Sequence, residues 1–155
     1  MRPLMITAAL LLATTGTALA EDRMPGHAMR PDQLQWGPAP SVLPKGAQFA
    51  VLAGDPGKAG PFTIRLKASA GYKIPAHSHP TAERVTVISG DFHFAMGDKL
   101  DEAKAEKLGS GGFVDLPAKM NHYAFMSTET VVQIDSEGPF AITYVNPADD
   151  PSKAQ

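Results

Sequence analysis

Short apolar runs separated by clusters of Gly, Pro and Asp make up most of the chain from Gly46 onward. In FTIRLK, residues 62–67, Phe62, Ile64 and Leu66 alternate with polar side chains, as in a β-strand that buries one face. Strand-forming composition recurs in eight runs, at residues 47–54, 61–69, 84–89, 91–96, 112–116, 122–126, 130–135 and 140–145. We therefore predict a sheet of short, antiparallel strands.

The sequence provides no helical layer to cover such a sheet. Residues 98–109, DKLDEAKAEKLG, are almost wholly polar, and we predict a solvated loop with one or two turns there. Gly90-Asp91 lies between Ser89 and Phe92, where the centre of a tight hairpin turn would lie. Without a helical layer, the strands bury their apolar faces only if the sheet folds onto itself. The predicted fold is all-β, a single antiparallel β-barrel or jelly roll.

The first 20 residues, MRPLMITAALLLATTGTALA, have the pattern of a secretory signal peptide, with one Arg, an apolar stretch and the small-x-small sequence Ala18-Leu19-Ala20. The apolar stretch is shorter than the roughly 20 residues that span a bilayer. It contains neither paired arginines nor cysteine, so neither a twin-arginine signal nor a lipoprotein anchor is indicated. We expect cleavage near Ala20 and a periplasmic or secreted protein.

Removal of this leader leaves 155 − 20 = 135 residues, enough for one domain. We expect four segments, a signal peptide at 1–20, a Pro-rich arm or linker at 21–45, a barrel domain at 46–147 and a C-terminal tail at 148–155. Within the arm, Met24, His27 and Met29 could be imagined as soft copper ligands, but a plain Pro-rich tail is the better interpretation. Trp36 is a candidate for docking the arm onto the barrel.

Net charge and the absence of cysteine exclude some classes of binding partner and of metal ligand. The net charge of −2 becomes −3 once the leader is removed, because Arg2 is its only charged residue, and no basic stripe occurs. Nucleic acid and anionic membranes are therefore poor partners. The chain has no cysteine, so stability must come from burial, oligomerisation or a bound ion, and thiolates are excluded from any ligand set.

HSHPTAE, residues 77–83, places two of the five histidines one residue apart and a glutamate four residues later. Side chains at i and i+2 of a strand leave the same face, so His77 and His79 should point together. Glu83 regains that side after a turn at Pro80, and three metal ligands would then come from seven residues. An isolated His-x-His pair is more often a pair of solvated loop residues, and the pair alone does not decide between the two interpretations.

The spacing around that pair is more specific. Five residues fill every fixed position of the pattern G-x5-HxH-x3-E-x6-G, namely Gly71, His77, His79, Glu83 and Gly90. This stretch resembles the first motif of the cupin family. The second cupin motif, G-x5-PxG-x2-H-x3-N, is matched by Gly111, Pro117 and His122. Two positions depart from this motif, because Lys119 replaces the usual glycine and Met126 replaces the usual asparagine. The motif therefore does not predict the conformation of the turn or the packing beside the metal.

The resemblance covers roughly Gly46 to Val145. It implies a cupin β-barrel with one divalent metal ion held by four side chains, His77, His79, Glu83 and His122. Three imidazoles and one carboxylate suit Zn(II), Cu(II), Ni(II), Mn(II) or Fe(II), and they do not suit Ca(II), which takes oxygen ligands alone.

Other side chains are weaker candidates for the chemistry. His93 alternates with Phe92 and Phe94, so it faces outward if the two phenylalanines face the core. Gln133 and Asp135 share one face of their strand, toward either the cavity or solvent, and we assign no general base. The cavity rim is expected to be apolar, with Phe125, Met126, Met120, Val85 and Val87 as candidates, although core packing is the favoured role for most of them.

Two classes of function follow from the resemblance. Cupins similar to this chain include dioxygenases, oxidases, decarboxylases and isomerases, and also sugar-binding and seed-storage proteins. We expect either a metal-dependent oxidoreductase, lyase or isomerase that offers open coordination positions to a small molecule, or a non-catalytic protein that binds metal, a sugar or an organic acid. Because such barrels have edge strands and the arm carries a Trp that can cross to a neighbour, we also expect a homodimer.

Overall fold

The computed structural model describes Gly26 and residues 28–153. The strands, in chain order, are β1 (Gly37–Pro38), β2 (Gln48–Ala53), β3 (Gly60–Ala68), β4 (Lys73–Ser78), β5 (Glu83–Ser89), β6 (Asp91–Met96), β7 (Glu106–Gly109), β8 (Phe113–Leu116), β9 (His122–Phe125), β10 (Thr130–Gly138) and β11 (Thr143–Tyr144). Short 3-10 helices occur at η1 (Pro31–Gln33), η2 (Glu102–Lys104), η3 (Pro147–Asp149) and η4 (Pro151–Lys153).

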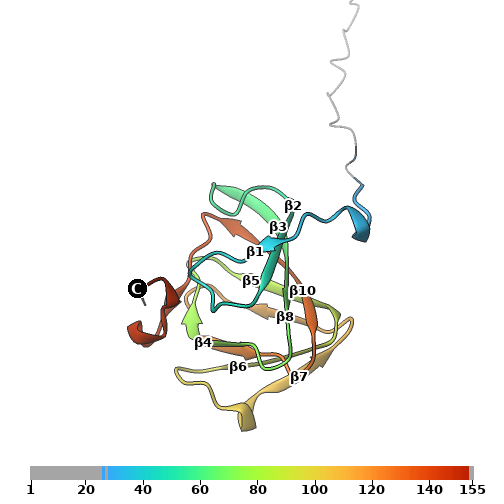
Figure 1. Cartoon of the computed structure of the whole chain (residues 1–155). Helices are drawn as coiled ribbons and strands as arrows, with labels where there is room; N and C mark the ends of the chain where they lie inside the picture. Colours follow the sequence, from blue (N-terminus) through green and yellow to red (C-terminus); the bar gives the residue numbers. More distant parts are fainter. Residues whose placement is uncertain (1–25, 27, 154–155) are drawn as a thin grey trace, which may run out of the picture.

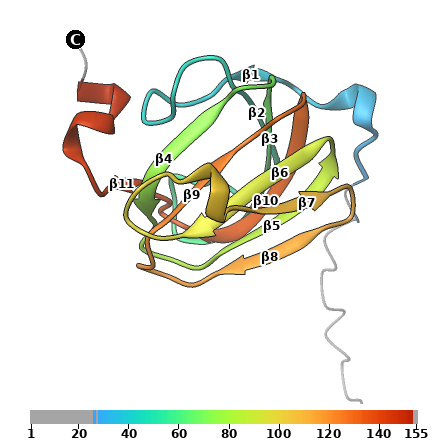
Figure 2. The same ribbon diagram turned by 90° about the horizontal axis from the view of Figure 1, so that it is seen from below.

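Two antiparallel sheets wrap around a common centre (Figure 1; Figure 2). The first has the strand order β1-β2-β3-β10-β5-β8, and the second has the order β11-β4-β9-β6-β7. Because consecutive strands often belong to different sheets, the chain crosses repeatedly between the two layers. The predicted all-β barrel is confirmed.

The apolar core lies between the sheets and follows the alternation read from the sequence. Phe62, Ile64 and Leu66 of β3 are buried. On the neighbouring strand β10, Val132 and Ile134 are buried opposite Leu66 and Ile64 in the antiparallel register. The two longest strands therefore form the centre of the first sheet and turn one apolar face toward the second.

Each of the eight predicted runs overlaps a strand, but the predicted loop at residues 98–109 is partly wrong. Its second half forms β7, which pairs with β6 at the edge of the second sheet, from Asp91 opposite Gly109 to Phe94 opposite Glu106. Its first half contains η2, in agreement with the expected turn. Leu108 is the single apolar side chain of this strand to pack against the core, so the short edge strand shows no apolar alternation and gave no signal.

The predicted hairpin at Gly90-Asp91 is also wrong. Gly90 does have the positive φ of a tight turn, +80°. However, the flanking strands β5 and β6 belong to different sheets, so the turn carries the chain from one layer to the other. A Cβ at Gly90 would collide with the backbone of Glu129 and Thr130, which explains why glycine occupies this corner.

Part of the segment expected to be an arm lies on the barrel. Gly37 in β1 pairs with Phe49 in β2, and Leu43 packs against the apolar core. The Lys67 ammonium lies 4.7 Å from the centroid of the Trp36 ring, a cation–π contact between this segment and β3. The expected signal peptide, Met24 and His27 lie outside the described residues. In the part of the chain that the structure describes, none of the helices has the length and apolar character needed to cross a membrane.

Candidate metal centre

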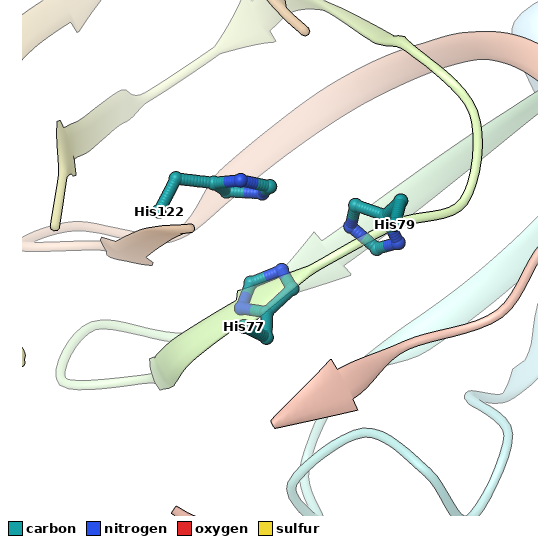
Figure 3. A group of neighbouring side chains, drawn as sticks. All are labelled: His77, His79 and His122. Atoms are coloured by element: carbon teal, nitrogen blue, oxygen red, sulfur yellow. The ribbon is translucent and has the colours of Figure 1, made fainter. Parts of the chain in front are cut away.

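Three histidines converge between the two sheets. His77 lies in β4, His79 follows that strand, and His122 begins β9, where it is the cross-strand partner of His77. One nitrogen from each ring lies within 4.8 Å of the others, and Figure 3 shows the three imidazoles turned toward a common point. All three side chains are buried, with 3–4% of their surface exposed. The structure thus brings together histidines from both sequence motifs.

Backbone carbonyls fix the tautomer of all three imidazoles. The Nδ1 atoms of His77, His79 and His122 lie 2.7, 2.8 and 3.0 Å from the carbonyl oxygens of Pro75, Ala141 and Met120, respectively. Because a carbonyl oxygen only accepts, each Nδ1 must carry the hydrogen. Each neutral ring therefore has its lone pair on Nε2, the form that ligates a metal, and the carbonyl also fixes the ring orientation.

Glu83 adds a carboxylate from the opposite sheet. Residues 80–82 carry the chain from β4 to β5, and Glu83 Oε2 lies 3.6 Å from His79 Nε2 and 3.5 Å from His122 Nε2. Those two nitrogens are buried and have no hydrogen-bond partner. Since a carboxylate oxygen and bare imidazole nitrogens are all acceptors, they repel one another unless a positive charge lies between them. The donor set therefore fits a divalent transition-metal ion.

The surroundings set the charge states of these groups. Burial lowers the pKa of His77 to about 3, and the nearby His122 and His79 lower it further. Burial likewise lowers the pKa of His79. For Glu83, burial raises the pKa, but a proton on His122, followed by His79 and His77, lowers it by more, so the pKa lies below its ordinary value. Neutral imidazoles and an ionised carboxylate are the ligating forms of these residues near neutral pH.

The four side chains line a small cavity of about 50 Å³. The rest of its lining is apolar and consists of Leu43, Ile74, Val85, Phe92, Leu116, Ala124, Phe140 and Ile142. Since a water molecule needs roughly 10–15 Å³ of such space, an ion with one or two waters, or a donor group of a few atoms, fills it. Among the residues that the structure describes, His77, His79, Glu83 and His122 are the ionisable side chains of this lining.

Three residues that close the cavity were not candidates in the sequence. Leu43 comes from the segment expected to be an arm, whereas Phe140 and Ile142 follow β10. The alternation in residues 140–145 places Phe140 and Ile142 on one side of the chain, but it does not say what that side meets. Only the crossover after β10 brings them to the histidines.

The cavity is apolar around the four ionisable side chains, as predicted, and core packing holds for three of the five named candidates, Val85, Val87 and Met126. Of these five candidates, only Val85 lines the cavity. Met126 and Val87 are buried in the core, and Met120 is 51% exposed. Phe125 stacks on His93, with ring centroids 4.5 Å apart, on the far side of its sheet. The wrong assignment of Phe125 arose because β9 is buried on both faces, so apolar character did not identify the face toward the cavity.

The two departures from the second cupin motif have distinct consequences. Lys119 adopts the left-handed conformation, with φ of +63°, that glycine takes without strain. Its backbone N–H donates to the carbonyl of His79 at 2.8 Å, so the turn that joins the two motifs is kept. Met126 is buried in the core, and its backbone is hydrogen-bonded to Gly71 and Tyr72. The thioether therefore fills core space and does not line the cavity.

The remaining polar candidates lie outside the cavity. His93 faces away from the buried Phe92, as its parity predicted, and its Nε2 lies 3.1 Å from the Ser127 hydroxyl. Gln133 and Asp135 lie on the face of β10 opposite its buried residues. Asp135 accepts a hydrogen bond from the Thr63 hydroxyl at 2.6 Å, so this face is an outer surface of the first sheet.

The sequence matches the ChrR cupin-like domain over residues 25–141. The chain belongs to this cupin family. The match spans both motifs, from the first glycine to beyond the last histidine, and it confirms the resemblance inferred from their spacing. No curated protein matches the chain.

Solved cupins share the fold at low sequence identity. The polyketide cyclase RemF from Streptomyces resistomycificus has a TM-score of 0.68 and 16% identity, over 84% of this chain and 92% of RemF. An RmlC-like cupin from Shewanella frigidimarina has a TM-score of 0.57 and 16% identity, over 74% and 94% of the two chains. The DMSP lyase DddQ from Ruegeria pomeroyi has a TM-score of 0.56 and 20% identity, over 72% and 60%. Likeness at these identities establishes the fold, and the reaction must be argued from the site.

Proposed function

We propose that this cupin binds one divalent transition-metal ion through His77, His79, Glu83 and His122 and presents its open coordination positions to a small molecule. One observation carries the proposal. Two buried Nε2 atoms, on His79 and His122, face the Glu83 carboxylate without a hydrogen-bond partner. A buried, unpartnered polar group costs about 1–3 kcal/mol, and one cation would satisfy all of these atoms together.

The chain's own residues would orient the ligands and exclude water. The three carbonyls that accept from Nδ1 hold the imidazoles in one tautomer and one orientation. The apolar lining limits solvent around the donor atoms, which strengthens electrostatic interactions there. A bound ion would supply Lewis-acid or redox chemistry at positions that a four-ligand site leaves open.

The proposed partner is a small molecule with oxygen donors. Solved proteins of the same fold include a polyketide cyclase and a DMSP lyase, which supports a small-molecule partner. We favour a metal-dependent oxidoreductase, lyase or isomerase. Simple binding of a metal with an organic acid or sugar is the second candidate, because the described cavity lining offers no ionisable side chain beyond the four ligands for proton transfer.

We also propose that the protein is exported and forms a homodimer. Export is supported by the leader pattern in residues 1–20, which lies outside the described residues. The homodimer is supported by exposed edge strands, including β8 with Phe113 at 56% exposure. Analytical ultracentrifugation at tens of micromolar tests it, and sedimentation as a monomer alone would exclude this assembly.

Metal stoichiometry tests the central proposal. We expect about one divalent ion per chain in the full-length protein, measured by elemental analysis, and loss of that ion in the His77→Ala, His79→Ala double variant. His93→Ala is the matched control, because it removes a histidine that lies outside the cavity. If the double variant keeps full stoichiometry, the ligand assignment is wrong.

A spectroscopic experiment separates small-molecule chemistry from simple metal binding. The visible spectrum of cobalt-substituted protein should change when oxalate, malonate or a sugar acid displaces metal-bound water. If none of these chelators changes the spectrum at millimolar concentration while the water remains exchangeable, simple metal binding is the better description.

A further inference from the structure

A second cavity lies directly outside the candidate metal centre. This outer pocket has a volume of about 250 Å³ and is lined by Pro40, Val42, Leu43, Phe49, Pro56, Gly57, Ile64, Phe140, Ala141 and Ile142. None of these residues has a polar side chain. The outer pocket is therefore suited to an uncharged, apolar group, since burying an unpaired charge there would be costly.

The outer pocket and the metal cavity share a wall. Leu43, Phe140 and Ile142 line both spaces. The Phe140 ring stacks on His79, with centroids 4.3 Å apart and planes inclined by 13°. A molecule that reaches from the histidines into the outer pocket must therefore pass between these three side chains.

One part of this wall is the segment 42–44, whose backbone is held by two tyrosines. Tyr144 donates its hydroxyl hydrogen to the carbonyl of Val42 at 2.7 Å, and Tyr72 donates to the carbonyl of Pro44 at 2.7 Å. These bonds hold the backbone on either side of Leu43, whose side chain lines both spaces. Tyr72 directly precedes β4, and Tyr144 lies in β11, where it is the cross-strand partner of His77.

We propose that the outer pocket binds the apolar part of a ligand whose oxygen donors lie on the metal, and that Leu43 and Phe140 separate these two parts. The inference rests on the proposed function. The metal cavity has room for a donor group of a few atoms, and the larger apolar space adjoins it across one layer of side chains. The ligand class is a small chelator with an uncharged apolar substituent.

Alkyl hydroxamic acids of increasing chain length test this inference. We expect their affinity for the cobalt-loaded full chain, measured by calorimetry and by the cobalt spectrum, to rise about fourfold per methylene until the outer pocket is filled. A hydroxamic acid whose alkyl chain ends in a carboxylate should not show this increase in affinity with chain length. Gel filtration followed by elemental analysis checks that cobalt stays on the protein.

Two tryptophan variants locate the binding of the alkyl chain. Val42→Trp should fill the outer pocket and abolish the chain-length dependence while acetohydroxamic acid still binds. Val145→Trp is the matched control, because Val145 has similar exposure, 38% against 36%, but does not line the pocket. Leu43→Ala removes part of the wall and should speed the binding of octanohydroxamic acid.

The possible failures are distinguishable. If cobalt binds and acetohydroxamic acid changes its spectrum, but affinity is independent of chain length, the inference about the outer pocket is wrong and the metal site stands. The same conclusion follows if Val42→Trp and Val145→Trp behave alike. If the protein takes up no cobalt, the proposed function itself is wrong. The inference about the outer pocket, which rests on it, is then wrong as well.

Discussion

Phe140 lies flat against the imidazole of His79, with the ring centroids 4.3 Å apart. The next residue, Ala141, accepts a hydrogen bond from Nδ1 of the same histidine at 2.8 Å. One short segment after β10 thus both packs against a candidate ligand and sets its tautomer. Because rotation of the His79 ring would break both contacts, the position of this segment and the geometry of the metal centre are coupled.

Replacing the stacked ring should loosen the site without removing a ligand. In Phe140→Ala, we expect full metal stoichiometry with affinity reduced by roughly tenfold, as is typical when support around a ligand is lost. Competition with a chromophoric chelator measures this change. Phe140→Leu keeps most of the packing volume and should lie closer to wild type. Equal affinities in all three proteins would show that the stacking does not contribute.

Removal of the metal should lower the melting temperature. An ion that binds only the folded state stabilises it by about 2.7 kcal/mol when its free concentration is 100 times the dissociation constant. Dialysis against EDTA should therefore lower the melting temperature by several degrees, and added metal should restore it. The His77→Ala, His79→Ala double variant is the control, since EDTA should not affect its melting curve. An EDTA response of the same size in that variant would contradict the prediction.

Asp91 links β6 to the turn that follows β9. Its carboxylate accepts hydrogen bonds from the Ser127 hydroxyl at 2.7 Å and from the backbone N–H groups of Ser127 and Thr128 at 2.9 and 3.1 Å. The Lys107 ammonium lies 3.1 Å away. The Ser127 hydroxyl, followed by Lys107 and the two N–H groups, holds the pKa of Asp91 well below its ordinary value despite burial.

The lowered pKa of Asp91 predicts a specific loss of stability in acid. Because the folded pKa is below the unfolded value of about 3.9, the stabilisation is complete above that pH and is lost as the pH falls toward the folded pKa. Asp91→Asn should therefore lower the unfolding free energy by about 1–3 kcal/mol at pH 7, and the difference from wild type should shrink below about pH 4.

Denaturant unfolding at pH 7, 5 and 3 measures the effect of Asp91. Asp115→Asn is the control, because the Asp115 side chain is 59% exposed and its nearest cation, Arg84, is 3.9 Å away. That variant should differ little from wild type at any of these pH values. A loss in Asp91→Asn that stays constant from pH 7 to pH 3 would mean that the carboxylate charge is not responsible.

The cluster of candidate ligands could be predicted from the sequence because its geometry is mostly local. His77 and His79 are two residues apart, and the turn at Pro80 leaves little freedom in where Glu83 lies. His122 required the second motif, since its pairing with His77 joins residues 45 positions apart, 122 − 77. The residue spacing of the second cupin motif predicted that long-range contact, whereas the alternation within single strands gives no information about it.

The cavity walls could not be predicted in the same way. Leu43 lies in a Pro-rich stretch without periodicity, and the hydroxyls of Tyr72 and Tyr144 hold the backbone on either side of it. Similarly, Gly90 has the turn chemistry of a hairpin, but a glycine with positive φ serves equally well where the chain changes sheets. Local sequence thus indicated eight of the strands, but not β1, β4 or β7, while the partners of each strand depended on packing between the sheets.

Lys119 should be a site where substitution stabilises the protein. A non-glycine residue in the left-handed region costs about 1–2 kcal/mol, partly offset by the greater freedom that glycine gives the unfolded chain. Lys119→Gly should therefore raise the unfolding free energy by up to about 1 kcal/mol, measured by denaturant unfolding of metal-free protein. Lys119→Ala is the control, because it shortens the side chain and keeps the strain. If alanine stabilises as much as glycine, backbone strain is not the cause.

The identity of the ion should follow from where the site closes. A leader without paired arginines is expected to cross the membrane with the chain unfolded, so the proposed site would take its metal from the exterior pool. For a histidine-rich site, the Irving–Williams order favours Cu(II), Ni(II) and Zn(II) over Fe(II) and Mn(II). Elemental analysis of protein isolated from its own compartment should therefore find mainly zinc, copper or nickel. Protein made without residues 1–20 should fold inside the cell and reflect the different metal supply there. Iron or manganese as the main ion in the exported protein would show that geometry or supply overrides affinity at this site.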